Sequence, residues 1–207
     1  MSSETPTSTP TYGGVRWRRF AAIFTAAATM AVALITLTAK GVIAAQFSIS
    51  GMPFTVTSTQ LSGTGFEQFA VLDTMVPGSP NEGDTGGQLV LIVSAINEAE
   101  LQDLCQSINL GGTNLRLTAG APGRPVRART LIVDSDLIQG DAAFNNISIG
   151  QDASTLDKVP GVTGPIGVFG QQADTVTIKN LRQNNYATTA ASFTLPNLSM
   201  GFASEGC

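Results

Sequence analysis

The stretch that decides the fold is QLVLIVSA, residues 88–95. It follows PGSPNEGDTGG, residues 77–87, a segment made almost entirely of loop-forming and turn-forming residues. A short and nearly continuous apolar run after such a loop is typical of a strand in the middle of a sheet, buried on both faces. We therefore expect the domain to be built around this strand.

Short runs of Val, Ile, Thr and Phe bounded by Gly, Pro and Asn recur on both sides of it, which indicates further strands. Before it we expect strands within residues 46–72, with a Gly-rich turn ahead of FEQFAVL. After it we expect turns or loops at 134–140 and 151–170, and strands at 115–118, 126–133, 142–149, 174–181, 186–195 and 198–202. Roughly nine to eleven strands predict a mainly β fold, an antiparallel sandwich or flattened barrel.

One short helix is predicted directly after the central strand. Asn97 is a candidate N-cap, and Glu100 follows three residues later, close to a capping box. Apolar residues then recur at helical spacing, at Leu101, Leu104, Cys105 and Ile108. Gly111-Gly112 would end the helix, on which Cys105 would face the core.

The sequence contains two cysteines, Cys105 and Cys207. An even pair in a segment expected outside the membrane favours a disulfide. The alternatives are two free thiols or a bridge to another chain through Cys207. An intrachain bridge would close a loop of about 100 residues, which contributes about 4–5 kcal/mol when calculated from chain entropy.

The N-terminal part divides into two regions ahead of the β domain at residues 46–207. Residues 1–15 are rich in Ser, Thr, Pro and Gly and predict a disordered cytoplasmic tail. Residues 16–45 contain Arg16, Trp17, Arg18 and Arg19, followed by an uncharged apolar stretch at 20–39. Twenty such residues match the hydrocarbon thickness of a bilayer. The arginines on one side predict a cytoplasmic N-terminus and an extracytoplasmic β domain, and Trp17 suits the interface.

Two interpretations of this apolar stretch remain open. As a single N-terminal transmembrane helix it anchors the protein in the cell membrane, and its length favours that interpretation over the shorter apolar region of a signal peptide. A small-residue cleavage site after Ala44 or Ala45 would instead release the domain. Fractionation of cells distinguishes them, because cleavage would yield a soluble species without the first residues.

The charge distribution and the absence of histidine exclude several classes of function. The net charge is −4, and the negative charge is concentrated after residue 40, so nucleic-acid binding is not expected. Without histidine there is no His-based triad, and no G-x-S-x-G motif occurs. Two cysteines are too few for a zinc site. We expect no catalytic residues, no metal and no cofactor.

The cations after residue 45 include one cluster, Arg124, Arg127 and Arg129. Arg127 and Arg129 alternate with small or apolar residues and would share the outer face of a strand. One interpretation is contact with phosphate head groups or with an acidic partner. The other is a charged edge strand that prevents aggregation.

Several segments taken together resemble a known family: RWRRF and the Ala-rich stretch, SGMPFTVTSTQLSGTGF, AELQDLCQSI, FNNISIGQDAS and the final cysteine. They are similar to uncharacterised actinobacterial membrane-anchored surface proteins, some of which are labelled cholesterol esterases. The resemblance implies an envelope location, while the missing histidine and G-x-S-x-G motif give esterase activity no support.

We therefore expect a non-enzymatic envelope protein with a structural or interaction role, either self-associating or bound to another envelope protein. The alternative is a lipid-binding module that holds an acyl chain or sterol in an apolar groove. Three segments alternate as such a lining requires, at residues 54–61, 131–138 and 191–198. An esterase is a distant third.

Overall fold

The computed structural model describes residue 17 and residues 19–25, 28–29, 49–79 and 81–207. The chain divides into two compact units, Met1–Ile43 and Ala44–Cys207. The described residues of the first unit are helical, and Trp17 and Arg19 are exposed. Among the described residues, no helix is both long and apolar enough to cross a membrane.

Several N-terminal predictions fall outside the described residues. Arg16, Arg18 and most of the apolar stretch at 20–39 belong to this part, as do the tail at 1–15 and the cleavage site near Ala44. The transmembrane helix and its orientation therefore stay predictions.

The second unit is mainly antiparallel β-sheet, which confirms the predicted fold class at that level. Four strands are long: β1 (Phe54–Thr74), β2 (Gln88–Gln102), β5 (Val126–Asn145) and β7 (Phe169–Thr189). Five are short: β3 (Leu104–Asn109), β4 (Asn114–Ala119), β6 (Ser148–Asp152), β8 (Ser192–Thr194) and β9 (Ser199–Ala203). A helical turn, α2 (Glu82–Thr85), and a 3₁₀ turn (Ala153–Thr155) lie in connecting segments.

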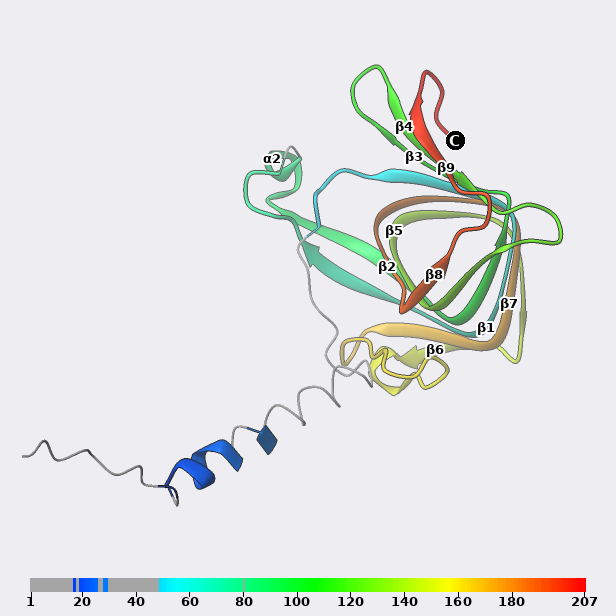
Figure 1. Cartoon of the computed structure of the whole chain (residues 1–207). Coiled ribbons are helices and arrows are strands. Elements are labelled where there is room, and N and C mark those ends of the chain that lie inside the picture. The colour runs from blue at the N-terminus through cyan, green and yellow to red at the C-terminus, as the bar shows by residue number, and fades with distance from the viewer. Residues whose placement is uncertain (1–16, 18, 26–27, 30–48, 80) are drawn as a thin grey trace, which may run out of the picture. The chain divides into compact units, whose positions relative to one another are not determined.

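The four long strands pair in a closed ring, visible in Figure 1. β1 pairs with β2, β2 with β5, β5 with β7, and β7 with β1. A row of directly paired residues runs from Gln171 through Gln68, Ser94 and Val133, and it returns to β7 at Thr188. This large stagger means that the strands are strongly tilted. Because a tilted strand covers more of the circumference, four strands enclose an interior.

The short strands extend this ring. β3, β4 and β9 continue the sheet from the first residues of β1 and project beyond one end of the ring (Figure 1). β6 pairs with the start of β7, and β8 pairs with the start of β5. β9 is therefore the edge strand at that end of the sheet.

Two expected turns are wrong, because the chain continues there as strand. Gly65 has φ +65° within β1, and the β1–β2 register is the same on either side of it, where Thr64 pairs with Glu98 and Phe66 with Ile96. Gly140 has φ +151° and lies at a register shift between β5 and β7. Glycine permits the positive φ at both positions, and at Gly140 it permits a bulge, which bends a strand without ending it.

The predicted helix after Asn97 is also wrong, because this segment forms the end of β2 and the whole of β3. Asp103 has φ +49° and separates the two strands. Leu101 precedes it and Leu104 follows it, and both are buried. The left-handed backbone at Asp103 breaks the strict alternation of the strand, so two buried residues are three apart, a spacing that imitates a helix.

The strand at 88–95 is central, as predicted, but it is not buried on both faces. β2 pairs with β1 on one side and with β5 on the other. Leu91 is fully buried, whereas Val90 is 71% exposed and Ile92 is 37% exposed. One face of this strand is therefore apolar and partly open to solvent.

The predicted disulfide between Cys105 and Cys207 is present, with Cα atoms 5.9 Å apart. Cys105 lies on β3, and the backbone N–H of Cys207 donates to Ser107 Oγ on the same strand at 2.8 Å. Arg182 Nη1 donates to the Cys207 oxygen at 3.0 Å. These contacts fix the segment that follows β9.

Candidate ligand-binding site

The interior of the ring contains a cavity of about 290 Å³. This volume lies near the lower end of the range for small-molecule sites. All four ring strands supply apolar side chains to it, including Leu61, Phe66, Ile96, Leu131, Val133 and Ile178. The lining residues are all described, and none of them is charged. The cavity therefore suits an uncharged and largely apolar molecule.

The three segments expected to line a groove all contribute to this cavity. Val56 and Leu61 come from residues 54–61, and Phe193 comes from residues 191–198. The third segment, residues 131–138, contributes three side chains: Leu131, Val133 and Ile138. Leu131 and Val133 are two apart and share a face, whereas Ile138 reaches the cavity after the register shifts on either side of Ser135.

One polar group in the cavity lacks a partner. Asn185 lines the cavity, is only 1% exposed, and its Oδ1 atom accepts no hydrogen bond. It pairs with Ser135 on β5 and with Phe54 on β1, so it belongs to the wall of the ring. Gln183 is buried on the same strand and also lines the cavity.

A second polar group in the cavity is internally satisfied. Gln68 Nε2 donates to Ser94 Oγ at 2.9 Å, and Gln171 Nε2 donates to Gln68 Oε1 at 2.6 Å. Both Gln68 and Ser94 line the cavity. These side chains already form hydrogen bonds with one another. They therefore need a hydrogen bond from a ligand less than Asn185 does.

Two apolar residues that line the cavity are partly exposed, Ile92 and Phe193. Val90 lies two residues before Ile92 on the same face of β2, and its direct partner Leu72 on β1 is also exposed. The exposed face of the central strand is therefore continuous with the cavity lining.

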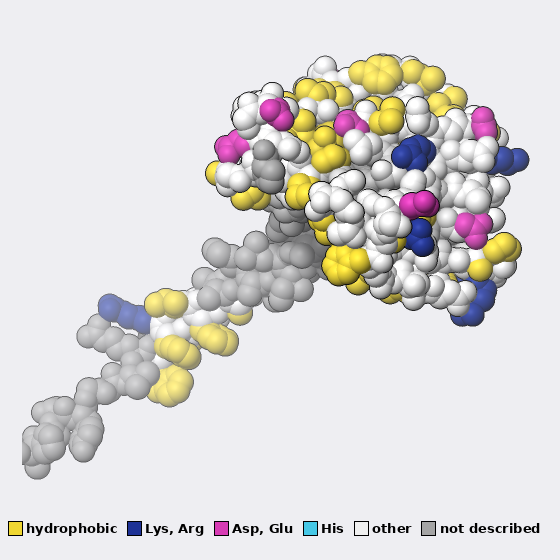
Figure 2. Space-filling model, turned by 90° about the horizontal axis from the view of Figure 1, so that it is seen from above, with side chains coloured by type: hydrophobic (Ala, Val, Ile, Leu, Met, Phe, Trp, Pro, Cys, Tyr) yellow, Lys and Arg dark blue, Asp and Glu magenta, His cyan; other side chains and the backbone are white. Residues whose placement is uncertain are grey.

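A second apolar surface lies on the sheet extension formed by β3, β4 and β9. Gln106 on β3 lines the cavity and pairs with Leu117 on β4, which pairs with Met200 on β9. Directly paired residues share a face of the sheet, so this row leads from the cavity to the edge strand. Met200 is exposed, and Phe202 beyond it is 74% exposed. The view in Figure 2 also shows hydrophobic side chains among scattered charges on the surface of the domain.

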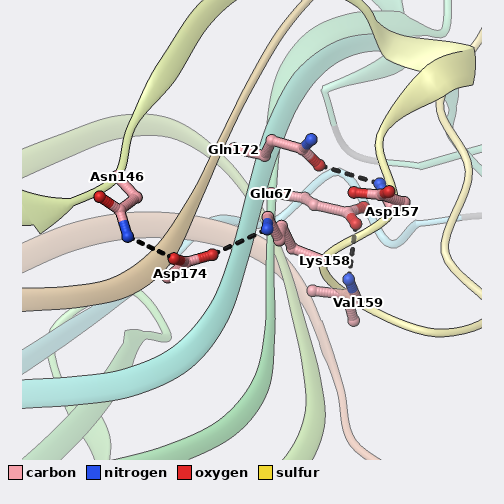
Figure 3. Close-up of polar contacts among 7 residues, drawn as sticks. All are labelled: Glu67, Asn146, Asp157, Lys158, Val159, Gln172 and Asp174. Atoms are coloured by element: carbon pink, nitrogen blue, oxygen red, sulfur yellow. Dashed lines mark hydrogen bonds and ion pairs between the residues drawn. The ribbon is translucent and has the colours of Figure 1, made fainter.

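The outer wall of the ring carries a polar cluster that holds a loop (Figure 3). The backbone N–H of Val159 donates to Glu67 Oε1 at 2.6 Å, and that of Asp157 donates to Gln172 Oε1 at 2.9 Å. Lys158 forms an ion pair with Asp174 at 2.7 Å. All three contacts join the loop to the wall of the ring, which indicates a structural role.

Glu67 and Asp134 are two of the wall carboxylates that have raised pKa values. Burial raises the pKa of Glu67, although its hydrogen bond from Val159 opposes this effect. Burial, with a smaller contribution from the negative charge of Asp73, raises the pKa of Asp134 to about 6. Neither residue lines the cavity, so neither is a candidate group for catalysis there.

Arg127 and Arg129 of the predicted arginine cluster share one face of β5, beside two glutamates of β2. Arg127 on β5 forms an ion pair with Glu100 at 2.9 Å, and Arg129 pairs in register with Glu98. Arg124 lies in the turn before β5, where its backbone N–H bonds to Ala121. The acidic neighbours reduce the net positive charge, and the head-group contact stays a prediction.

The chain belongs to the DUF6230 family, a family of unknown function whose model matches residues 50–207. The match covers the whole β ring and its extension. No curated protein matches the chain. No solved structure matches it either.

Sequence reasoning did not identify Asn185 and Gln183 as site residues. They lie in QNNYA, residues 183–187, where polar residues alone do not show which side chains face inward. A register shift between β5 and β7, where Asp134 pairs with Ala187 and Ser135 with Asn185, decides the orientation here. The only signal in the sequence for their orientation was the alternation of polar and apolar residues along this strand.

Proposed function

We propose that the β domain binds an apolar molecule in the cavity of the ring. The single observation that carries the proposal is an uncharged cavity of about 290 Å³, lined by all four long strands. Apolar pockets with a few polar groups are typical of small-molecule binding sites. The exposed Val90 and Leu72 beside the cavity support the proposal, because an apolar molecule needs an apolar route of entry.

The location that we propose is the cell envelope, with the β domain outside the membrane. The Cys105–Cys207 disulfide supports it, since disulfides persist in oxidising compartments. The cluster of Arg16, Arg18 and Arg19 before the apolar stretch supports a cytoplasmic N-terminus. So does the resemblance to membrane-anchored surface proteins.

A structural or adhesive role remains the second candidate, and the edge strand β9 favours it. An unpaired strand edge with exposed Met200 and Phe202 can pair with a second copy or with another envelope protein. A Phe202→Lys variant would then change the sedimentation of the protein without changing ligand binding.

We propose no catalytic step. Ser94 lines the cavity, but no carboxylate or cationic side chain lines the cavity with it.

Solvent extraction and mass spectrometry of the purified full-length chain test the binding function. We expect one small apolar molecule per chain, at near-stoichiometric amounts. Val133→Phe should abolish this signal, because Val133 is buried in the cavity wall and a larger side chain occupies the space. Val76→Phe is the matched control, because Val76 is exposed and outside the cavity. Equal ligand content in the unaltered chain and in both variants would contradict the proposal.

A further inference from the structure

Resting on the proposed binding function, we infer that the ligand is a neutral amphiphile whose polar end donates a hydrogen bond to Asn185. Asn185 Oδ1 is the starting point. It is buried, it lines the cavity and it has no hydrogen-bond partner. Buried polar atoms are nearly always paired, and an unpaired one costs stability. A donor on the ligand would supply the missing partner.

The neighbouring groups do not supply that donor. Ser135, the register partner of Asn185, uses its hydroxyl on the Ile92 carbonyl at 3.4 Å. Gln68 and Ser94 are engaged with each other. Asn185 Oδ1 is therefore left without a partner in a residue that lines the cavity, where a ligand would lie.

The charge of the cavity narrows the class of ligand. No lining side chain is charged, so an ionised carboxylate or phosphate would find no cationic partner there. Moving an ionised group out of water without a partner is strongly unfavourable. A hydroxyl or amide N–H satisfies the acceptor without this cost, which excludes free fatty-acid anions and phospholipid head groups from the site.

The volume of the cavity limits the apolar part of the ligand. A cavity of about 150 Å³ lined by apolar side chains holds benzene. A volume of about 290 Å³ is roughly twice that size and accommodates on the order of a dozen carbon atoms. A primary alcohol with a chain of about ten carbons is therefore a suitable probe.

The test uses the full-length chain loaded with the fluorescent apolar probe N-phenyl-1-naphthylamine. Displacement by 1-decanol is compared with displacement by its methyl ether and by decanoate. We expect the alcohol to bind about two- to tenfold more tightly than the ether, which corresponds to one net hydrogen bond. Decanoate should bind more weakly than either. The background signal is measured with Val133→Phe, in which the cavity is filled.

Variants of two neighbouring asparagines assign the effect to one side chain. Asn185→Leu should bind alcohol and ether equally. Asn184→Leu should keep the preference for the alcohol, because Asn184 donates to Asp136 and does not line the cavity. An unchanged preference in Asn185→Leu would overturn the inference.

The ligand series on the unaltered chain gives a second test that needs no variant. Equal affinity for the alcohol and the ether, or preferential binding of decanoate, would overturn the inference while leaving the binding function intact. If none of the three ligands displaced the probe, the proposed function itself would be wrong, and the inference with it.

Discussion

The backbone N–H of Val159 and the side chain of Glu67 form a hydrogen bond of 2.6 Å across the outer wall of the ring. Glu67 is fully buried, and its second oxygen, Oε2, has no partner. Two residues further along β1, Phe69 packs in a cluster with Ala153 and Leu156. A polar contact and an apolar cluster therefore hold the segment after β6 against the outer wall of the ring.

This contact predicts different effects for two substitutions of Glu67. Glu67→Gln keeps an oxygen that accepts from Val159 and removes a buried charge, so stability at pH 7 should be unchanged or higher. Glu67→Ala removes the acceptor and leaves the Val159 N–H unpaired, which should cost about 1–3 kcal/mol. Chemical denaturation measures both, and hydrogen exchange at residues 157–160 reports release of the loop. Equal losses in the two variants would contradict this account.

The raised pKa of Asp134 predicts that stability increases on mild acidification. Its pKa is about 6 in the folded state and 3.8 in the unfolded state, so the folded protein binds more protons between these values. The free energy of unfolding should therefore fall as pH rises from about 4 to about 6 and stay low above that. Asp134→Asn should flatten this dependence, as followed by denaturation across the range. An unaltered pH profile in the variant would exclude Asp134 as the cause.

The Cys105–Cys207 bridge predicts a large loss of stability on its removal. The cysteines are 102 residues apart, and a loop of this length corresponds to about 4–5 kcal/mol. Cys105→Ser should lower the free energy of unfolding by about that amount under non-reducing conditions. Ser107→Ala, which removes only the acceptor for the Cys207 N–H, should cost about 1 kcal/mol. Similar small losses in both variants would show that the bridge adds little.

Gly63 and Gly83 predict opposite responses to the same substitution. A Cβ on Gly63 would collide with Ile96 Cγ2 and would lie 3.0 Å from the Glu98 carbonyl oxygen, whereas a Cβ on Gly83 has nothing within 4 Å. Gly63→Ala should therefore cost about 1–3 kcal/mol, as overpacked sites do. Gly83→Ala should be neutral or slightly stabilising. Thermal unfolding of the two variants tests the close approach of β1 to β2.

The sequence allowed the strand-rich class, the central position of residues 88–95 and the cysteine pair to be predicted, because these depend on composition and local pattern. The lengths of the strands could not be predicted. Gly65 and Gly140 indicate turns locally, yet cross-strand pairing continues on both sides of each of them. Asp103 similarly made two strands imitate a helix.

Register shifts between β5 and β7 explain why only part of the site was foreseen. Val56, Leu131 and Phe193 lie in segments with clear alternation, and these segments were identified as a possible lining. Asn185 lies next to a register shift, and each shift changes which residues face inward. Its orientation therefore depends on pairing with β5, which the local sequence does not contain.

The most direct test of the central claim is the binding of N-phenyl-1-naphthylamine to the full-length chain and to two phenylalanine variants. The account predicts saturable binding to the unaltered chain and to Val76→Phe, with loss of that binding in a folded Val133→Phe protein. Saturable binding of equal strength to all three proteins would contradict it, because the probe would then be bound outside the cavity of the ring.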